Sequence, residues 1–149
     1  MEEHIYNVDL EWRSQRKGEI SSPELEKPIE VATPPEFPKG MAGIWSPEHL
    51  YTAAVSSCFM TTFLAIAENS GLEFTSLVCP AKGKLSKKEG RFVMSEIILA
   101  PLLTIQEEKD LEKAEKILHK AEKACLITNS ITAEVILKPQ VELAESLIY

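Results

Sequence analysis

The longest apolar stretch of the sequence constrains the fold more than any other feature. It runs from Ser46 to Asn69 and reads SPEHLYTAAVSSCFMTTFLAIAEN. Ser46 is a typical N-cap, Pro47 suits the first helical position, and a glycine at Gly71 is a typical helix end. As a helix the stretch would be ~36 Å long, enough to span a bilayer, but its charged ends and frequent Ser and Thr residues disfavour a membrane span. Because its apolar side chains occupy more than one face, we predict a central core helix that is buried on most faces.

Composition and charge limit the classes of function. The 149 residues, 44% of them hydrophobic and 26% charged, fit a single domain over residues 1–149. The net charge of −7 argues against binding to nucleic acids or to anionic membranes. The N-terminus lacks the basic and apolar regions of a signal peptide, so a cytoplasmic location is expected. The odd number of cysteines, three, argues against a disulfide scaffold there.

The rest of the chain predicts an α+β domain with mainly antiparallel sheets. Alternating apolar and polar residues give His4–Trp12 one apolar face, as in a half-buried strand. We expect a second helix over Gln106–Ala124, capped by Thr104, with a narrow apolar stripe on one face. Pro101 should bend the strand that contains it. The remaining strands are expected at Glu19–Ser22, Pro28–Thr33, Phe74–Leu85, Arg91–Ile105 and Thr132–Val141.

Two cysteines are placed where they can meet. Cys58 lies at the centre of the first helix, and Cys125 ends the second helix on its apolar stripe. Free cysteine commonly behaves as a small buried hydrophobe, so an inert structural role is one interpretation. The other is a reactive pair, which requires a cation to lower the pKa of one thiol and a second thiol to resolve its oxidised form. The candidate cations in irregular regions of the sequence are Arg13, Arg16, Lys17 and Lys39.

Two motifs carry a resemblance to a known family. The segment Ser46–Leu50, followed by Ala53-Ala54 and Ser57-Cys58-Phe59, resembles the "(N/S)PE-x-L…AA…(A/S)CF" helix of the OsmC/Ohr family, the osmotically inducible protein C-like and organic hydroperoxide resistance proteins. The segment Lys120–Cys125, with Asn129-Ser130 shortly after it, is similar to that family's second cysteine motif, "A-x-x-x-C-P-x-S-N/Q". The second match departs from the family at Leu126-Ile127, where the family has proline.

The resemblance implies a thiol peroxidase that reduces organic hydroperoxides. It would make Cys58 the peroxidatic cysteine and Cys125 the resolving one, with an external dithiol, lipoyl-type in the Ohr branch, restoring both. An arginine would lower the pKa of Cys58, and Glu48 would orient that arginine. Arg16 matches the family's turn after the first strand best, with Arg13 and Lys39 as the alternatives. The implied fold is OsmC-like, with two antiparallel-rich sheets around two long helices in an intertwined homodimer.

Helix geometry independently favours a dimer. Glu48 and Cys58 lie ~15 Å apart along one helix, so a composite site between two chains is needed to bring them together. No metal is expected, because the three histidines share no metal-like spacing with the cysteines, and no cofactor is implied. The expected partners are a second copy of the chain, an organic hydroperoxide and a dithiol reductant. The alternatives are an OsmC-like protein without peroxidase activity that binds a small ligand, and a purely structural dimer.

Overall fold

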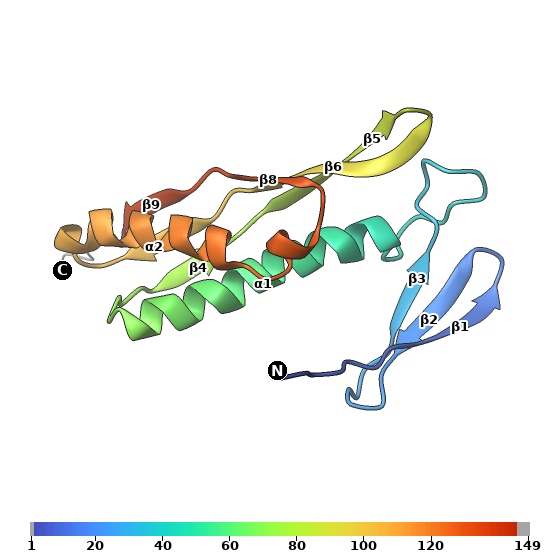
Figure 1. Cartoon of the computed structure of the whole chain (residues 1–149), viewed down its shortest axis with the longest axis horizontal. Coiled ribbons are helices and arrows are strands. Elements are labelled where there is room, and N and C mark those ends of the chain that lie inside the picture. Colours follow the sequence, from blue (N-terminus) through green and yellow to red (C-terminus); the bar gives the residue numbers. More distant parts are fainter. Residues whose placement is uncertain (1, 146–149) are drawn as a thin grey trace. The chain divides into compact units, whose positions relative to one another are not determined.

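The computed structural model describes residues 2–145 and divides the chain into two compact units, one ending at Leu50 and the other starting at Tyr51. The first unit contains a three-stranded antiparallel sheet in the order β1-β2-β3 (Figure 1). Its strands are β1 (Asp9–Ser14), β2 (Lys17–Ser21) and β3 (Ile29–Ala32). A two-residue turn joins β1 to β2, and an irregular loop leads from β3 to the first helix.

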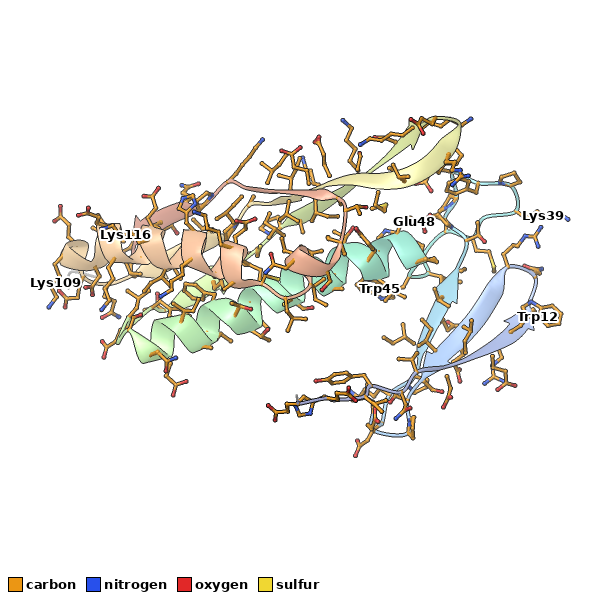
Figure 2. The ribbon with its side chains drawn as sticks, viewed as in Figure 1. Trp12, Lys39, Trp45, Glu48, Lys109 and Lys116 are labelled. Carbon is orange, nitrogen blue, oxygen red and sulfur yellow. The ribbon has the colours of Figure 1, made fainter. Side chains whose placement is uncertain are left out.

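The first strand differs from its prediction in extent and in burial. It starts at Asp9 rather than at His4. The apolar side chains of Tyr6, Val8, Leu10 and Trp12 are 67–84% exposed, so the predicted half-burial is wrong for the chain taken alone. Figure 2 shows Trp12 projecting away from the strand that carries it. The alternation predicted an apolar face correctly, but no layer of the first unit covers that face.

The second unit contains two mixed sheets, in the orders β5-β6-β8 and β4-β7-β9. The pairs β5–β6 and β4–β7 are antiparallel, whereas β6–β8 and β7–β9 are parallel. Figure 1 shows β5 and β6 as a long hairpin. The strands are β4 (Ser76–Val78), β5 (Ala81–Lys88), β6 (Arg91–Leu99), β7 (Leu102–Ile105), β8 (Glu134–Leu137) and β9 (Gln140–Leu143).

Prolines divide each extended segment of this unit into two strands. Pro80 separates β4 from β5, Pro101 lies between β6 and β7, and Pro139 separates β8 from β9. Proline lacks the backbone N–H that a sheet ladder uses, so a long strand breaks where it occurs. The bend predicted at Pro101 is confirmed. The predictions of single strands over Phe74–Leu85 and Thr132–Val141 are wrong for the same reason.

Neighbouring segments stay paired across these breaks. The amide of Ala100 donates to the carbonyl of Pro80 at 3.0 Å, and the amide of Gln140 donates to the carbonyl of Pro101 at 2.9 Å. The carbonyls of Pro80 and Pro101 thus accept hydrogen bonds, although neither proline has an N–H to donate. Each of the three extended segments, β4–β5, β6–β7 and β8–β9, therefore contributes one strand to each of the two sheets.

Helix α1 (Pro47–Asn69) begins and ends where the sequence predicts. The amide of His49 donates to Oγ of Ser46 at 3.2 Å, and the amide of Ser46 donates back to Nδ1 of His49 at 3.3 Å. This reciprocal pair is a capping box with histidine in the usual place of glutamate or glutamine. At the other end, Gly71 has a φ of +68°, and the amide of Leu72 donates to the carbonyl of Ala67 at 2.9 Å.

The burial of α1 differs from the prediction. Only one stripe is fully buried within the chain, and it consists of Val55, Phe59, Phe63 and Ala67. On other faces Met60 is 43% exposed and Leu64 is 40% exposed, so the prediction of burial on most faces is wrong for a single chain. Among the described residues, α1 is the one helix whose length and composition would also suit a membrane span, a test that core helices of soluble proteins pass as well.

Helix α2 (Leu111–Ala124) follows a short 3₁₀ turn, η1 (Glu108–Asp110). The predicted cap Thr104 is wrong, because this residue lies in β7 opposite Ser76. The predicted apolar stripe is confirmed by the burial of Ala114, Ile117, Leu118, Ala121 and Cys125. Figure 2 shows the side chains of Lys109, in η1, and Lys116, in α2, projecting outward. The stripes of α1 and α2 join Ile97, Leu99, Leu103 and Ile105 of the strands in one apolar core.

Candidate active site

The fold of the second unit brings Cys58 and Cys125 into contact. Cys58 lies in the middle of α1, next to the buried Phe59, and is partly accessible. Cys125 directly follows the last residue of α2, where the backbone leaves the helix with a ψ of 117°, and its side chain is fully buried. The two thiols lie close enough that each shifts the pKa of the other. The sequence prediction that these two cysteines can meet is therefore confirmed.

The loop that follows Cys125 directs two backbone amides at the sulfur of Cys58. The backbone amides of Leu126 and Ile127 both favour the thiolate of Cys58 and lower its pKa. The loop is held in place because the amide of Asn129 donates to the carbonyl of Cys125 at 3.1 Å, and the hydroxyl of Ser130 donates to the carbonyl of Leu126 at 2.7 Å. The chain then makes a 3₁₀ turn, η2 (Thr128–Ser130). Backbone donors fixed in this way can stabilise a negative charge without rearrangement.

These contacts lower the pKa of Cys58. Burial by itself raises the pKa of this thiol, but hydrogen bonds from Cys125, from the Ile127 amide, from Thr62 and from the Leu126 amide outweigh burial, so the pKa lies below its ordinary value. The hydroxyl of Thr62 lies 3.9 Å from the sulfur, one turn further along α1. Hydrogen bonds to a charged group favour the charged form, here the thiolate.

The same contact acts in the opposite direction on Cys125. Burial raises the pKa of Cys125, and its hydrogen bond to Cys58 raises it further. One thiol of the pair is therefore poised to lose its proton and the other to keep it. A thiolate beside a protonated thiol is the arrangement in which the first attacks an electrophile and the second condenses with the oxidised product.

The third cysteine has a different environment. Cys79 lies before Pro80 at the break between β4 and β5, and burial raises its pKa. Cys58 is thus the cysteine of this chain whose pKa is lowered, and the one on which several hydrogen-bond donors converge. The surroundings of the two thiols thus shift their pKa values in opposite directions.

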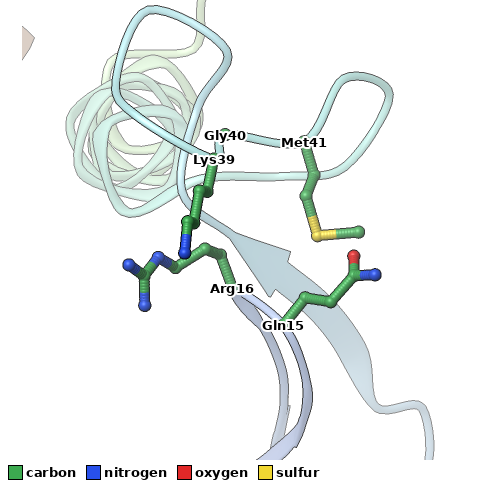
Figure 3. A pocket seen from close by; sticks show the side chains of 5 residues that line it. All are labelled: Gln15, Arg16, Lys39, Gly40 and Met41. Atoms are coloured by element: carbon green, nitrogen blue, oxygen red, sulfur yellow. The ribbon is translucent and has the colours of Figure 1, made fainter.

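The cation candidates lie in the first unit and differ in their partners. Arg13 forms ion pairs with Glu19 at 2.9 Å and Glu11 at 3.0 Å, and the hydrogen bond that Arg13 donates to Glu19 raises the pKa of Arg13. Arg16 lies in the turn between β1 and β2, where it lines a pocket together with Lys39 (Figure 3). Arg13 is therefore engaged with carboxylates of its own sheet, whereas Arg16 and Lys39 share one site.

Glu48, the other predicted site residue, lies in the capped first turn of α1 and is partly buried. Because α1 is continuous from Pro47 to Asn69, Glu48 is ~15 Å from Cys58 along the helix axis. The structure thus brings the two predicted cysteines together. Arg16 and Glu48 belong to the first unit.

Comparison with known proteins places this geometry in a family. Residues 40–140 match the family model described as OsmC-like protein. The chain belongs to the OsmC-like family. It is similar to the uncharacterized protein YmaD of Bacillus subtilis (strain 168), with 27% identity over 140 residues, which is 91% of this chain and 91% of that protein.

Solved structures of similar proteins confirm the predicted OsmC-like α+β fold. An OsmC-like protein of unknown function from Vibrio cholerae is 23% identical, with a TM-score of 0.82 over 92% of this chain and 99% of that chain. An organic hydroperoxide resistance protein from Elizabethkingia anophelis is 19% identical, with a TM-score of 0.73 over 96% of this chain and 100% of that chain. The organic hydroperoxide resistance protein OhrB of Bacillus subtilis is 21% identical, with a TM-score of 0.66 over 91% of this chain and 98% of that chain.

Sequence reasoning missed one functional feature of this OsmC-like chain, the pair of amides at Leu126 and Ile127. The signal was present in the second motif, because a residue other than proline after Cys125 adds a backbone N–H at that position. Within residues 2–145 there is no group of three or more His, Cys, Asp or Glu side chains that could hold a metal ion.

Proposed function

We propose that this OsmC-like protein is a thiol-dependent peroxidase that reduces organic hydroperoxides to alcohols. The observation that carries the proposal is the contact between Cys58 and Cys125, whose pKa values shift in opposite directions. Membership of the OsmC-like family supports it, as do the names of two similar structures, both organic hydroperoxide resistance proteins.

The reaction proceeds in two balanced steps. The Cys58 thiolate attacks the terminal peroxide oxygen, the O–O bond breaks, and the departing alkoxide takes a proton to leave as the alcohol. Cys58 is then a sulfenic acid. The Cys125 thiol condenses with it, which forms a disulfide and releases water. A dithiol of lipoyl type reduces this disulfide by exchange and is itself oxidised to a cyclic disulfide.

The proposed activation of Cys58 includes a cation as well as the neutral donors described above. Arg16 supplies the positive charge, and Glu48 orients Arg16 within a site that a homodimer completes. Arg16 takes this role rather than Arg13, because Arg13 is already paired with Glu11 and Glu19. The proposed location is the cytoplasm, where dithiol reductants are available to recycle the enzyme.

Single-residue variants test the mechanism. Reduced protein is mixed with cumene hydroperoxide and dihydrolipoamide, and the loss of peroxide is followed. The proposal predicts steady turnover by the wild type and none by Cys58→Ser. The Cys125→Ser variant should react once and accumulate a sulfenic acid at Cys58, which a dimedone adduct reveals by mass spectrometry. The Cys79→Ser variant serves as the matched control and should keep full activity.

One specific observation keeps a second candidate function in view. All the groups that lower the pKa of Cys58 are neutral donors of the second unit. A protein that binds a small thiol or apolar ligand without reducing peroxides would need no more than this. Turnover of peroxide no faster than that of free thiol would favour this second function over the first.

A further inference from the structure

The hydroxyl groups of α1 near Cys58 have two kinds of partner. Those of Ser56 and Ser57 donate to backbone carbonyls three residues earlier, at 3.2 and 3.3 Å. The hydroxyl of Thr61 does the same, and the carbonyl that accepts from it at 3.1 Å is that of Cys58. Serine and threonine side chains commonly bond to the helix backbone in this way. These three hydroxyls are therefore engaged with the backbone of α1.

Thr62 differs from them, because its hydroxyl faces a sulfur atom. Its Oγ1 lies 3.9 Å from Sγ of Cys58, one turn earlier on the same face of α1. Cys58 is partly accessible, so a small substrate has access to this contact. A thiolate has lone pairs but no proton, and the hydroxyl of Thr62 is consequently the donor when Cys58 is ionised. Thr62 thus directs a hydrogen bond at the atom that acts as the nucleophile in the proposed reaction.

The negative charge moves during that reaction. It starts on the sulfur of Cys58, and when the O–O bond breaks, the electron pair of that bond leaves with the alkyl-bearing oxygen. A donor that stabilises the sulfur in the starting state does not lower the barrier, whereas a donor that reaches the departing oxygen does. The reaction is therefore favoured by a donor whose direction can change.

Among the groups that lower the pKa of Cys58, Thr62 suits this role best. The amides of Leu126 and Ile127 belong to a loop that backbone and side-chain hydrogen bonds hold in place, so their direction is fixed. The thiol of Cys125 is a weak donor, is fully buried, and has to keep its proton until the disulfide forms. The hydroxyl hydrogen of Thr62 rotates about the Cβ–Oγ1 bond and can turn from the sulfur to an oxygen beside it.

We propose that Thr62 is a catalytic residue, whose hydroxyl contacts the sulfur of Cys58 and donates a hydrogen bond to the departing oxygen of the peroxide. The inference rests on the proposed peroxidase function. The S–O bond forms as the O–O bond breaks, and both electrons of the O–O bond stay with the departing alkoxide. Thr62 keeps its own proton throughout. The proton that completes the alcohol comes from water, to which the thiol of Cys58 gave one when it ionised.

The test separates an effect on the thiolate from an effect on the departing oxygen. The parent is the full chain carrying Cys79→Ser, and Thr62→Val added to it preserves the branched shape but removes the hydroxyl. Two reactions of Cys58 are followed over one range of pH. Alkylation by monobromobimane releases bromide, which takes no proton, whereas reduction of one equivalent of cumene hydroperoxide releases an alkoxide. Thr61→Val is the matched control, because it removes the neighbouring hydroxyl that bonds to the backbone.

The expected result is a difference between the two reactions. At a pH that ionises Cys58 fully, Thr62→Val should be alkylated at the parent rate but should reduce the peroxide about tenfold more slowly. Its alkylation midpoint should also move to higher pH, because the thiolate has lost a donor that lowers the pKa of Cys58. Thr62→Ser restores a hydroxyl and should recover most of the peroxide rate. Thr61→Val should match the parent in both reactions.

Two patterns would overturn the inference while the peroxidase function stands. A fast parent with an equally fast Thr62→Val variant would show that the hydroxyl does not reach the departing oxygen. An equal loss of peroxide rate in Thr61→Val, or no recovery in Thr62→Ser, would assign the effect to the packing of α1. A parent that reduces peroxide no faster than free thiol would overturn the proposed function itself, and the role of Thr62 with it.

Discussion

At the scale of single residues, the two partly accessible cysteines of the chain should differ in their pH dependence. Hydrogen bonds lower the pKa of Cys58 despite its burial, whereas burial raises the pKa of Cys79. The thiolate is the reactive form, so alkylation of each cysteine rises with pH through its own pKa. We predict that monobromobimane labels Cys58 at a lower pH than Cys79. Labelling of both cysteines with the same midpoint would contradict the assigned hydrogen bonds.

The backbone amide of Leu126 can be removed by one substitution. Leu126→Pro deletes the N–H that donates to Cys58, and the ψ of 117° at Cys125 suits a residue before proline. Losing one hydrogen bond to a charged sulfur should slow the reaction of Cys58 with a bimane or a peroxide about tenfold at neutral pH. The control Leu126→Ala keeps the amide and should react at the wild-type rate. A proline variant as fast as the alanine variant would show that this amide does not act on the thiolate.

The sequence predicted this site only in part. It identified Cys58 at the centre of an apolar helix and Cys125 on the apolar stripe of the second helix, and because the two helices must share a core, it predicted that the cysteines can meet, as they do. It did not reveal the amides of Leu126 and Ile127 as donors, because the absence of proline after Cys125 shows that an N–H is present at Leu126 but not where that N–H points. That Arg16 lowers the pKa of Cys58 and that Glu48 orients Arg16 stay predictions, which derive from the family resemblance.

At the scale of elements, one glycine of β5 lies directly against a side chain of α1. A Cβ atom on Gly83 of β5 would collide with Oγ1 of Thr52 and would lie 2.8 Å from Cε of Met94. The methionine end can move aside, but a β-branched side chain on a helix has few alternative rotamers. Gly83 therefore allows α1 to pack directly on this strand.

Gly83→Ala should accordingly lower the free energy of unfolding by about 1–3 kcal/mol. In urea denaturation the midpoint should fall while the slope stays unchanged. Adding Thr52→Ala removes the colliding oxygen and should recover part of the loss, which a double-mutant cycle measures. Lys82→Ala, at an exposed position of the same strand, is the control. Additive effects of the two alanine substitutions would contradict this close contact.

The elements were predictable where local chemistry decides them. The bounds of α1 follow from Ser46, Pro47 and Gly71, which act within one turn of the chain. The divided strands were harder to predict, because a proline can end a strand or only bend it, and the outcome depends on the neighbouring segments. Thr104 has the chemistry of a helix cap, but its place opposite Ser76 in the sheet overrides that preference.

At the scale of the whole molecule, two apolar surfaces lack a cover within the chain. One is formed by Tyr6, Val8, Leu10 and Trp12 of the first unit, and the other by Met60 and Leu64 of α1. Soluble monomers rarely expose such groups of large apolar side chains, and interfaces between subunits commonly bury them. These surfaces support the proposed homodimer.

Sedimentation equilibrium should give the wild type twice the chain mass of 16.6 kDa. Leu64→Glu places a charge on the exposed apolar face of α1, and this variant should shift toward the monomer at micromolar concentration. Lys116→Glu, on the charged face of α2, should leave the mass unchanged. A wild type that sediments as a monomer, or a Leu64→Glu variant as dimeric as the wild type, would contradict the proposed dimer.

The central claim is that Cys58 and Cys125 act as one redox pair. The most direct test mixes reduced protein with one equivalent of cumene hydroperoxide and maps cysteine pairing by mass spectrometry over time. The account predicts rapid formation of a Cys58–Cys125 disulfide, with Cys79 left as a free thiol and no disulfide in the Cys58→Ser variant. Slow or scattered oxidation, in which Cys58 reacts no faster than Cys79, would contradict it.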